Sequence, residues 1–187
     1  MPRKKTSEPA RPVDDVPFVF PQEAHNILTN AQQGHITLSE MADTKASILM
    51  GATFVVFTLA IDHMTSNTPT LPLMILTVFS FLATILSVMA LRPKILKPPT
   101  TIQPNTNIVF FGSFSGIPEE QYISHVVDIM RSEEATYRAM ARDLYQNGQV
   151  LQRKKYRYLS YAYSSFLVGI VATFAVFLIE MAVEAMA

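Results

Sequence analysis

The chain has 187 residues, of which 15 are Lys or Arg and 15 are Asp or Glu, and it contains no Cys. This length favours a single folded unit, and the lack of Cys excludes disulfides, cysteine-ligated metals and a cysteine nucleophile. Apolar residues make up 49% of the chain. They concentrate in three runs without a charged side chain, 46–61, 71–91 and 159–179, and this pattern predicts a membrane protein.

The N-terminal segment, residues 1–20, combines four Pro with charges of both signs, which is typical of a disordered tail. Pro21 suits the first turn of a helix, so a cytoplasmic helix is predicted over 21–45. It continues into a first span over 46–62, and an outer loop is expected over 63–70. The first apolar run is the shortest of the three, and it can cross a bilayer if Lys45 extends its amine toward the headgroups.

A second span is predicted over 71–91 and a third over 159–180, with an outer tail over 181–187. A helical run of about 21 residues measures about 31 Å, which matches the hydrocarbon thickness of a bilayer. The predicted fold class is therefore an all-α membrane protein with three transmembrane helices and a cytoplasmic helical bundle between the second and third spans.

That bundle should come from residues 92–158. Pro and Asn over 97–107 predict an extended linker, and the apolar patch 108–114 is too short to span, so it should dock on the helices or on the membrane surface. One helix is expected to start at Pro118, and another starts at Glu133. The second helix shows near-heptad apolar positions at Tyr137, Met140, Leu144 and Leu151. No Pro follows residue 118, so this helix can run into the third span without a break.

The basic residues are sorted along the chain. All of them lie before the first apolar run or between the second and the third. Three spans place those two segments on the same side of the bilayer, and the positive-inside rule makes that side cytoplasmic. We therefore expect an inner-membrane protein with a cytoplasmic N-terminus and a periplasmic C-terminus.

A basic cluster directly precedes the third span. It consists of Arg153, Lys154, Lys155 and Arg157. Two interpretations stay open: the cluster sets the topology and contacts lipid headgroups, or it binds the phosphate of a nucleotide together with Arg138 and Arg142. Because the cluster is small and close to the membrane, double-stranded nucleic acid is a poor candidate partner.

Asp43 and Lys45 lie at the cytoplasmic mouth of the first span. A carboxylate at this depth should pair with a base. Lys45 is too close in sequence to lie on the same helical face. The expected partner of Asp43 is therefore a residue of the 153–157 cluster or of another subunit.

Small residues recur at spacings of four in two of the spans. They are Ser47 and Gly51 in the first span, and Ser165, Gly169 and Thr173 in the third. This spacing lets helices approach closely, within a subunit or between the subunits of a homo-oligomer, although chance alone also produces it.

No catalytic constellation is evident. The four His lie in no metal-binding spacing, and the six Gly are scattered rather than gathered in a phosphate-binding loop. We predict no enzyme activity, no metal and no cofactor.

Several motifs occur together in this chain. The first motif, at the entry of the first span, is Met41–Leu49. The second consists of Phe110-Phe111-Gly112-Ser113-Phe114 followed by Glu119-Glu120-Gln121-Tyr122. The third consists of Asp143-Leu144-Tyr145 followed by Leu151, Lys155-Tyr156 and Leu159. In combination they resemble the membrane effector family of the Pycsar anti-phage systems (PycTM type), over most of residues 25–180. The resemblance marks Asp43, Lys45, Phe111, Gly112, Phe114 and Tyr145 as motif positions, and it assigns no nucleotide contacts.

The resemblance implies an effector that responds to a cyclic pyrimidine mononucleotide, cyclic CMP or cyclic UMP, made by a partner cyclase during phage infection. Such an effector then damages the inner membrane. Some relatives carry a phosphohydrolase domain that this sequence lacks, so no enzyme is implied. One alternative is a membrane-anchored adaptor that recruits a protein partner through the helices of 119–158. A channel or transporter is disfavoured, because the first two spans hold no charge.

Overall fold

The computed structural model describes residues 21–66, 68–93, 97–103 and 105–186, so the predicted disordered tail lies outside the described residues. All regular structure within these ranges is helical. The elements are α1 (Gln22–Ser66), α2 (Leu71–Leu91), α3 (Phe111–Phe114), α4 (Glu119–Met130), α5 (Glu133–Val150), the π-helix η1 (Leu151–Tyr156) and α6 (Arg157–Met186).

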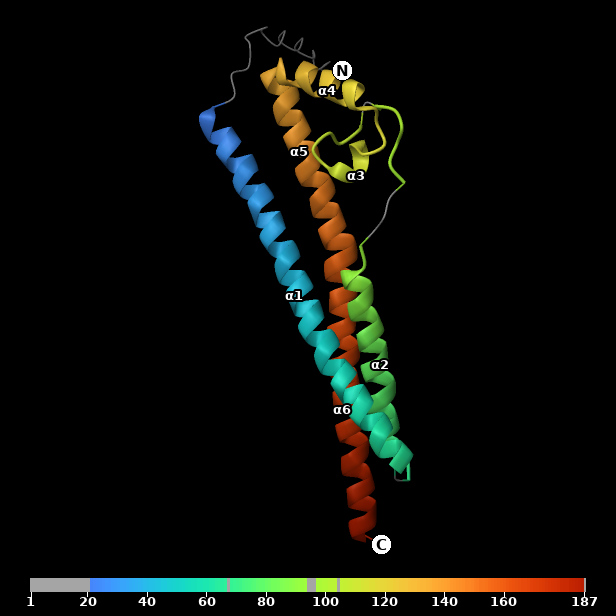
Figure 1. The fold of residues 1–187 in the computed structure, drawn as a ribbon. Coiled ribbons are helices and arrows are strands. Elements are labelled where there is room, and N and C mark those ends of the chain that lie inside the picture. The colour runs from blue at the N-terminus through green and yellow to red at the C-terminus, as the bar shows by residue number, and fades with distance from the viewer. Residues whose placement is uncertain (1–20, 67, 94–96, 104, 187) are drawn as a thin grey trace, which may run out of the picture.

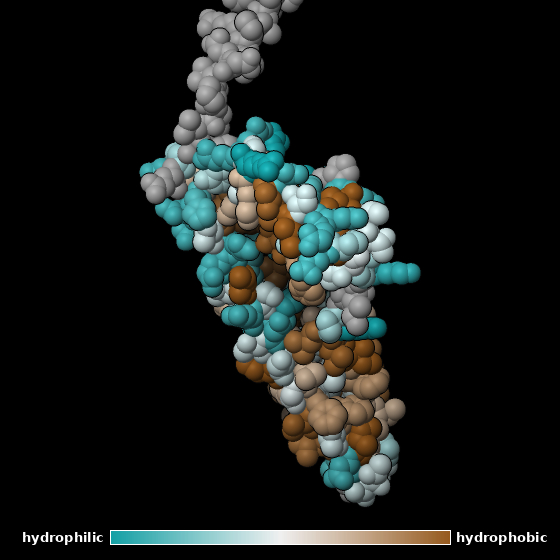
Figure 2. Space-filling view, turned by 45° about the horizontal axis from the view of Figure 1, so that its top comes forward, coloured by the Kyte–Doolittle hydropathy of each residue, from teal (hydrophilic) through white to brown (hydrophobic). Residues whose placement is uncertain are grey.

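Two long rods that run in the same direction organise the molecule (Figure 1). The first rod is α1, a single helix of 45 residues. The second is the unbroken succession of α5, η1 and α6. We call the part made of the first half of α1, residues 97–103 and 105–118, α4 and α5 the head. The part made of the second half of α1, α2 and α6 is the stem. Figure 2 shows mostly hydrophilic residues over the head and hydrophobic residues over the stem.

Three helices of the described chain are long and apolar enough to cross a membrane, within Glu23–Ser66, Leu71–Leu91 and Glu133–Met186. The predicted all-α class with three spans is therefore confirmed. Two boundaries differ from the prediction. α1 extends to Ser66, into the expected outer loop, because no Pro or Gly stands between Gly51 and Pro69 to end it. α6 extends to Met186, through most of the expected outer tail, which is rich in the good helix formers Ala, Met and Glu.

The inner face of α1 follows a strict alternation of four- and three-residue steps from head to stem. Every position of this series is buried or half-buried: Leu28, Gln32, His35, Ser39, Ala42, Ala46, Leu49, Thr53, Val56 and Ala60. A stripe with this period keeps one face of a helix against its neighbours over many turns, as in coiled coils. Ile27, Leu38 and Met41 lie outside this face and are exposed.

Small side chains fill the core of the stem. The buried residues of α2 are Pro72, Thr77, Ser80, Ala83, Ser87 and Ala90. Helices in membranes associate through close backbone approach and interhelical hydrogen bonds rather than through hydrophobic burial. The hydroxyls of Thr53 and Thr84 form such a bond between α1 and α2, with 2.9 Å between the two Oγ1 atoms.

The predicted packing residues of the third span line this core. Gly169 is buried, and a Cβ added there would collide with Phe79 of α2. Ser165 and Thr173 are half-buried on the same side of α6. The close approach of α6 to α2 therefore depends on glycine at position 169.

The predicted packing residues of the first span behave differently. Ser47 and Gly51 are exposed, and among the described residues nothing lies within 4 Å of a Cβ added at Gly51. A seam between these residues and another helix of the same subunit was therefore the wrong prediction, because α1 turns the face of Ala46 and Leu49 inward instead. A seam between subunits at this face stays a prediction.

The π-helix η1 joins two seams that are out of phase. The inward positions of the second rod are Met140, Leu144, Asn147, Leu151, Lys155, Leu159, Ala162, Phe166, Gly169 and Thr173. From Asn147 to Leu159 the spacing is four residues three times in succession. Four residues of an α-helix turn by about 400°, so each of these steps moves the stripe about 40° past a full turn. A π turn holds one extra residue per turn, and it therefore keeps both seams on one side of the rod.

Candidate functional site

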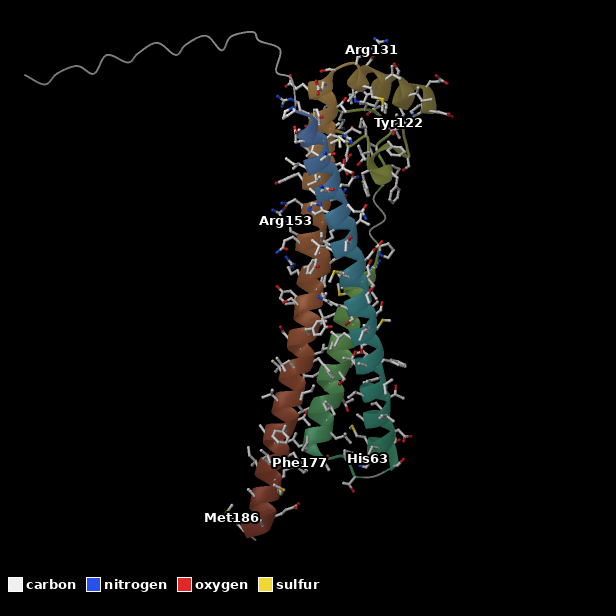
Figure 3. The ribbon with its side chains drawn as sticks, turned by 90° about the vertical axis from the view of Figure 1, so that its left-hand side faces the viewer. His63, Tyr122, Arg131, Arg153, Phe177 and Met186 are labelled. Carbon is white, nitrogen blue, oxygen red and sulfur yellow. The ribbon has the colours of Figure 1, made fainter. Side chains whose placement is uncertain are left out.

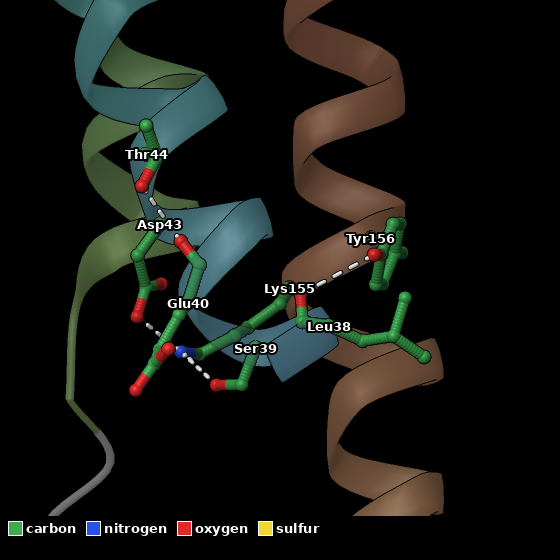
Figure 4. Close-up of polar contacts among 7 residues, drawn as sticks. All are labelled: Leu38, Ser39, Glu40, Asp43, Thr44, Lys155 and Tyr156. Carbon is green, nitrogen blue, oxygen red and sulfur yellow. Dashed lines mark hydrogen bonds and ion pairs between the residues drawn. The ribbon is translucent and has the colours of Figure 1, made fainter. Parts of the chain in front are cut away.

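An ion pair connects the two rods where the head meets the stem (Figure 4). Lys155 Nζ of η1 lies 2.6 Å from Asp43 Oδ2 of α1, and it also donates a hydrogen bond of 2.7 Å to Ser39 Oγ. The Tyr156 hydroxyl donates to the Leu38 carbonyl at 3.3 Å. We call these contacts the clasp. The prediction that Asp43 pairs with the 153–157 cluster is confirmed, and the partner within that cluster is Lys155.

The π turn divides the predicted basic cluster between two sides of the rod. Lys155 reaches α1, whereas Figure 3 shows Arg153 on the side that faces away from α1. On that other side lies a hollow of about 660 Å³, lined by Met89, Arg92, Pro93, Arg153, Lys154, Arg157 and Tyr158. We call it the basic hollow. Its fourth cation, Arg92, comes from the end of α2.

The two remaining members of the predicted ligand set lie elsewhere. Arg138 forms an exposed ion pair of 2.6 Å with Glu134 one turn away on α5. Arg142 is half-buried on the same helix. Arg138 precedes Arg153 by about 20 Å along the rod axis, so the six cations do not form one site in this subunit. The structure places them in the clasp, the basic hollow and the surface of α5.

A cavity of about 670 Å³ opens in the head between α1, the 108–114 patch and α5. Its lining includes Gln32, His35, Ser39, Glu40, Val109, Phe110, Phe111, Asp143, Asn147, Val150 and Lys155. This size lies within the range of small-molecule sites. Lys155 is the one Lys or Arg among the described lining residues, so the clasp forms part of the wall of this head cavity.

The polar groups of the head cavity are deeply placed. Asp143 is only 3% exposed, and its carboxylate accepts hydrogen bonds from Asn107 Nδ2 at 2.8 Å and, weakly, from Gln32 Nε2 at 3.5 Å. The Nδ1 atom of His35 is buried and has no hydrogen-bond partner among the described residues. A buried polar atom without a partner costs free energy, and it is available to a bound molecule.

Asn107 docks the apolar patch on α5. Its Oδ1 accepts from the backbone N–H groups of Val109 and Phe110 at 3.0 and 3.2 Å. Its Nδ2 donates to Asp143 and, at 3.2 Å, to Gln146 Oε1. The patch therefore docks on the helices, one of the two alternatives predicted for it, and a buried amide makes the connection.

The aromatic motif residues hold the patch in shape. Phe114 stacks on Tyr122 of α4 with ring centroids 4.5 Å apart, and the Tyr122 hydroxyl donates to the Ile108 carbonyl at 3.0 Å. A Cβ at Gly112 would lie 2.5 Å from the Phe110 ring, so a larger residue there would displace that ring. Phe111 is 70% exposed although it lines the cavity, and it is free to cover a bound molecule.

Two motif positions take no part in these contacts. Tyr145 is exposed on α5 and does not line the head cavity. Lys45 is exposed on α1, one residue away from a buried Ala46. Within the described residues of one subunit, neither supports the clasp.

Sequence reasoning assigned no role to four residues of these sites, Arg92, Asn107, Asp143 and His35, although Asp143 stands in one of the quoted motifs. A charged residue within a polar stretch reads as solvent-exposed, and only the tertiary fold shows that Asp143 meets Asn107. One signal was available for Asp143, which stands one residue before Leu144 of the predicted seam.

The family model of the Pycsar effector protein domain (PycTM) matches residues 26–181. This is most of the chain, so the chain belongs to the Pycsar effector family, which takes part in anti-phage defence and is not a known enzyme family. Membership implies coupling to a cyclic nucleotide made by a cyclase. No curated protein and no solved structure gives a significant match.

Proposed function

We propose that this Pycsar effector is activated by a cyclic pyrimidine mononucleotide, cyclic CMP or cyclic UMP, and that its active form impairs the inner membrane. The head lies in the cytoplasm with the N-terminus, and the C-terminus of α6 lies in the periplasm. This orientation agrees with the sorting of the basic residues. The active form is a homo-oligomer whose stems rearrange together.

The observation that carries this proposal is the position of the clasp. Lys155 holds α1 against the second rod and also lines the head cavity. A cyclic nucleotide carries one negative charge on its phosphate, and this anion competes with Asp43 for the Lys155 ammonium. Binding in the head cavity thereby acts on the contact between two helices that both continue into the stem.

The charges around Lys155 supply the difference in affinity that a switch requires. Glu40 lines the cavity and Asp43 pairs with Lys155, and both belong to α1. A phosphate at Lys155 is repelled by these two carboxylates. The nucleotide therefore binds more tightly when α1 has moved away from η1, and it shifts the population toward that arrangement.

The walls of the cavity suit a pyrimidine base. The rings of Phe110 and Phe111 lie 4.9 Å apart at one wall, and a base stacked on an aromatic ring gains about 1–3 kcal/mol. Carboxylates accept hydrogen bonds from the exocyclic amine of cytosine, and Asp143 of α5 lines the same cavity. The amine favours cyclic CMP over cyclic UMP, which presents a carbonyl oxygen there.

The test is the membrane potential of bacteria that express the chain with and without a pyrimidine cyclase. The wild-type chain should depolarise the cells only with an active cyclase. Lys155→Gln removes the cation of the cavity and should abolish binding of cyclic CMP to the purified full chain, measured by titration calorimetry. Arg138→Gln, which removes an exposed cation of α5, is the matched control. If the membrane potential of cells with the wild-type chain is the same with and without the cyclase, and the protein is confirmed in the membrane, the proposal is contradicted.

The adaptor remains the second candidate, and one surface favours it. The outward face of α4 exposes Ile123, Val127 and Met130 at 45%, 45% and 69%, and exposed apolar patches often mark protein contacts. An adaptor predicts an unchanged membrane potential and loss of a co-purifying partner after Ile123→Ser and Val127→Ser. Depolarisation by purified chain and nucleotide in vesicles without any other protein excludes it.

A further inference from the structure

We infer that the basic hollow binds the phosphodiester headgroup of an anionic phospholipid. This site lies on the opposite side of η1 from the clasp, and it does not depend on the nucleotide proposal. Its ligand class follows from the charge of the lining, the position of the hollow along the rods and the apolar residues beside the cations.

The lining of the hollow carries charge of one sign. Among the described residues, its lining includes four cations, Arg92, Arg153, Lys154 and Arg157, and no carboxylate. The head cavity, in contrast, combines Lys155 with Glu40 and Asp143. The planar guanidinium group of Arg donates paired hydrogen bonds to two oxygens of a phosphate. The hollow therefore suits a phosphodiester anion better than the head cavity does.

Three elements bring these cations together. Arg92 is the C-cap residue of α2, directly after the last apolar residue of that span. Arg153 and Lys154 come from η1, and Arg157 is the first residue of α6. Because the π turn keeps Lys155 on the side of α1, it leaves the other three cations of the cluster to face Arg92.

The position of the hollow selects a lipid over a soluble anion. It lies at the end of a 21-residue apolar helix, which places it at the level of the headgroups when that helix spans the bilayer. Met89, Pro93 and Tyr158 complete the lining. Tyr is typical of the membrane–water interface, and Met89 offers an apolar surface to the upper part of an acyl chain. A headgroup thus meets the cations while its chain stays beside the stem.

The test is phospholipid binding to the purified full chain in zwitterionic detergent, measured by native mass spectrometry. Phosphatidylglycerol should bind more tightly than phosphatidylcholine. Each Lys or Arg near an anionic surface contributes about a fivefold factor in affinity, so the double variant Arg92→Gln with Arg157→Gln should bind phosphatidylglycerol about 25-fold more weakly. The double variant Arg131→Gln with Arg138→Gln removes two exposed cations of the head and should bind like the wild type.

A charge-preserving variant separates binding from folding. Arg92→Lys with Arg157→Lys should retain the preference for phosphatidylglycerol, and the thermal midpoints of all variants show whether they are folded. Equal affinity of wild type and the Arg92, Arg157 double Gln variant for phosphatidylglycerol would overturn the inference. So would a wild type that prefers neither lipid but binds inorganic phosphate or cyclic CMP through these two Arg residues, because the anion would then come from solution.

Discussion

Replacing Asp43 with Asn should loosen α1 from the second rod at the junction of head and stem. The change removes the negative charge that lies 2.6 Å from Lys155 Nζ and keeps the size of the side chain. Charge-assisted hydrogen bonds contribute about 1.5–3 kcal/mol, whereas fully exposed ion pairs contribute about 0–1 kcal/mol. The two side chains are 25% and 43% exposed, so we expect a loss of about 1.5 kcal/mol, which is about a tenfold shift in population.

The assay is the distance between the rods in lipid vesicles. The chain has no Cys, so a spin label on Thr37→Cys and a second on Gln152→Cys report on α1 and η1 alone, and both positions are exposed. Pulsed electron resonance should show a small long-distance population in the labelled parent. That population, relative to the short-distance one, should rise about tenfold in Asp43→Asn.

Charge reversal separates the ion pair from simple side-chain loss. Asp43→Lys alone should widen the distribution further, because it sets two ammonium groups against each other. Adding Lys155→Asp should restore the short distance. Glu134→Gln, which removes an ion pair within α5, should have no effect. A distance distribution that does not change in Asp43→Asn, or that is not recovered by the charge swap, would refute the reasoning.

Two further predictions concern packing in the stem and docking in the head. Gly169→Ala should lower the thermal midpoint in detergent, because its Cβ collides with α2 and overpacking costs about 1–3 kcal/mol. Gly51→Ala meets open space among the described residues and should leave the midpoint unchanged. Equal losses in the two variants would show that Gly51 also packs. Asn107→Ala should free the patch 108–114, because Asp143 loses its shortest hydrogen bond, and hydrogen exchange of these amides should rise at least tenfold. The exposed Asn105→Ala is the control, and unchanged exchange in Asn107→Ala would show that other contacts hold the patch.

Much of the fold could be predicted because strong local signals specify it. The sorting of charges and the length of the apolar runs gave three spans, and Pro21 and Pro118 marked the starts of α1 and α4. These signals act within one helix or one turn of chain. The pairing of Asp43 with the basic cluster was also predictable, because a carboxylate at that depth needs a cation.

The sites were less predictable because they depend on phase and on distant partners. No residue type within 151–156 breaks a helix. The π turn arises only because the inward seams of α5 and α6 are out of phase. That turn decides which cation of the cluster meets α1. Arg92 joins Arg153 only because α2 ends beside η1. Sequence reasoning therefore found the cluster but could not divide it into two sites.

The π turn itself can be tested by deletion. Removing Gln152 takes one residue out of η1, and the inward series then reads in alternating steps of four and three from Met140 to Thr173. An α-helix with this period needs no π turn. Both seams, and Lys155 within them, should therefore keep their partners, and the thermal midpoint in detergent should be equal to or above that of the wild type. Removing Ser160, in the regular part of α6, is the matched control.

The control deletion shifts every later residue of α6 by about 100°. Gly169 then no longer faces Phe79, and we expect the midpoint to fall. In the Gln152 deletion the wide turn is gone, so Arg153, Lys154 and Arg157 lose their common direction toward Arg92. Binding of phosphatidylglycerol should therefore weaken although the fold survives. If removal of Gln152 lowers the midpoint as much as removal of Ser160, η1 is not an inserted residue between two seams, and the division of the basic cluster must have another cause.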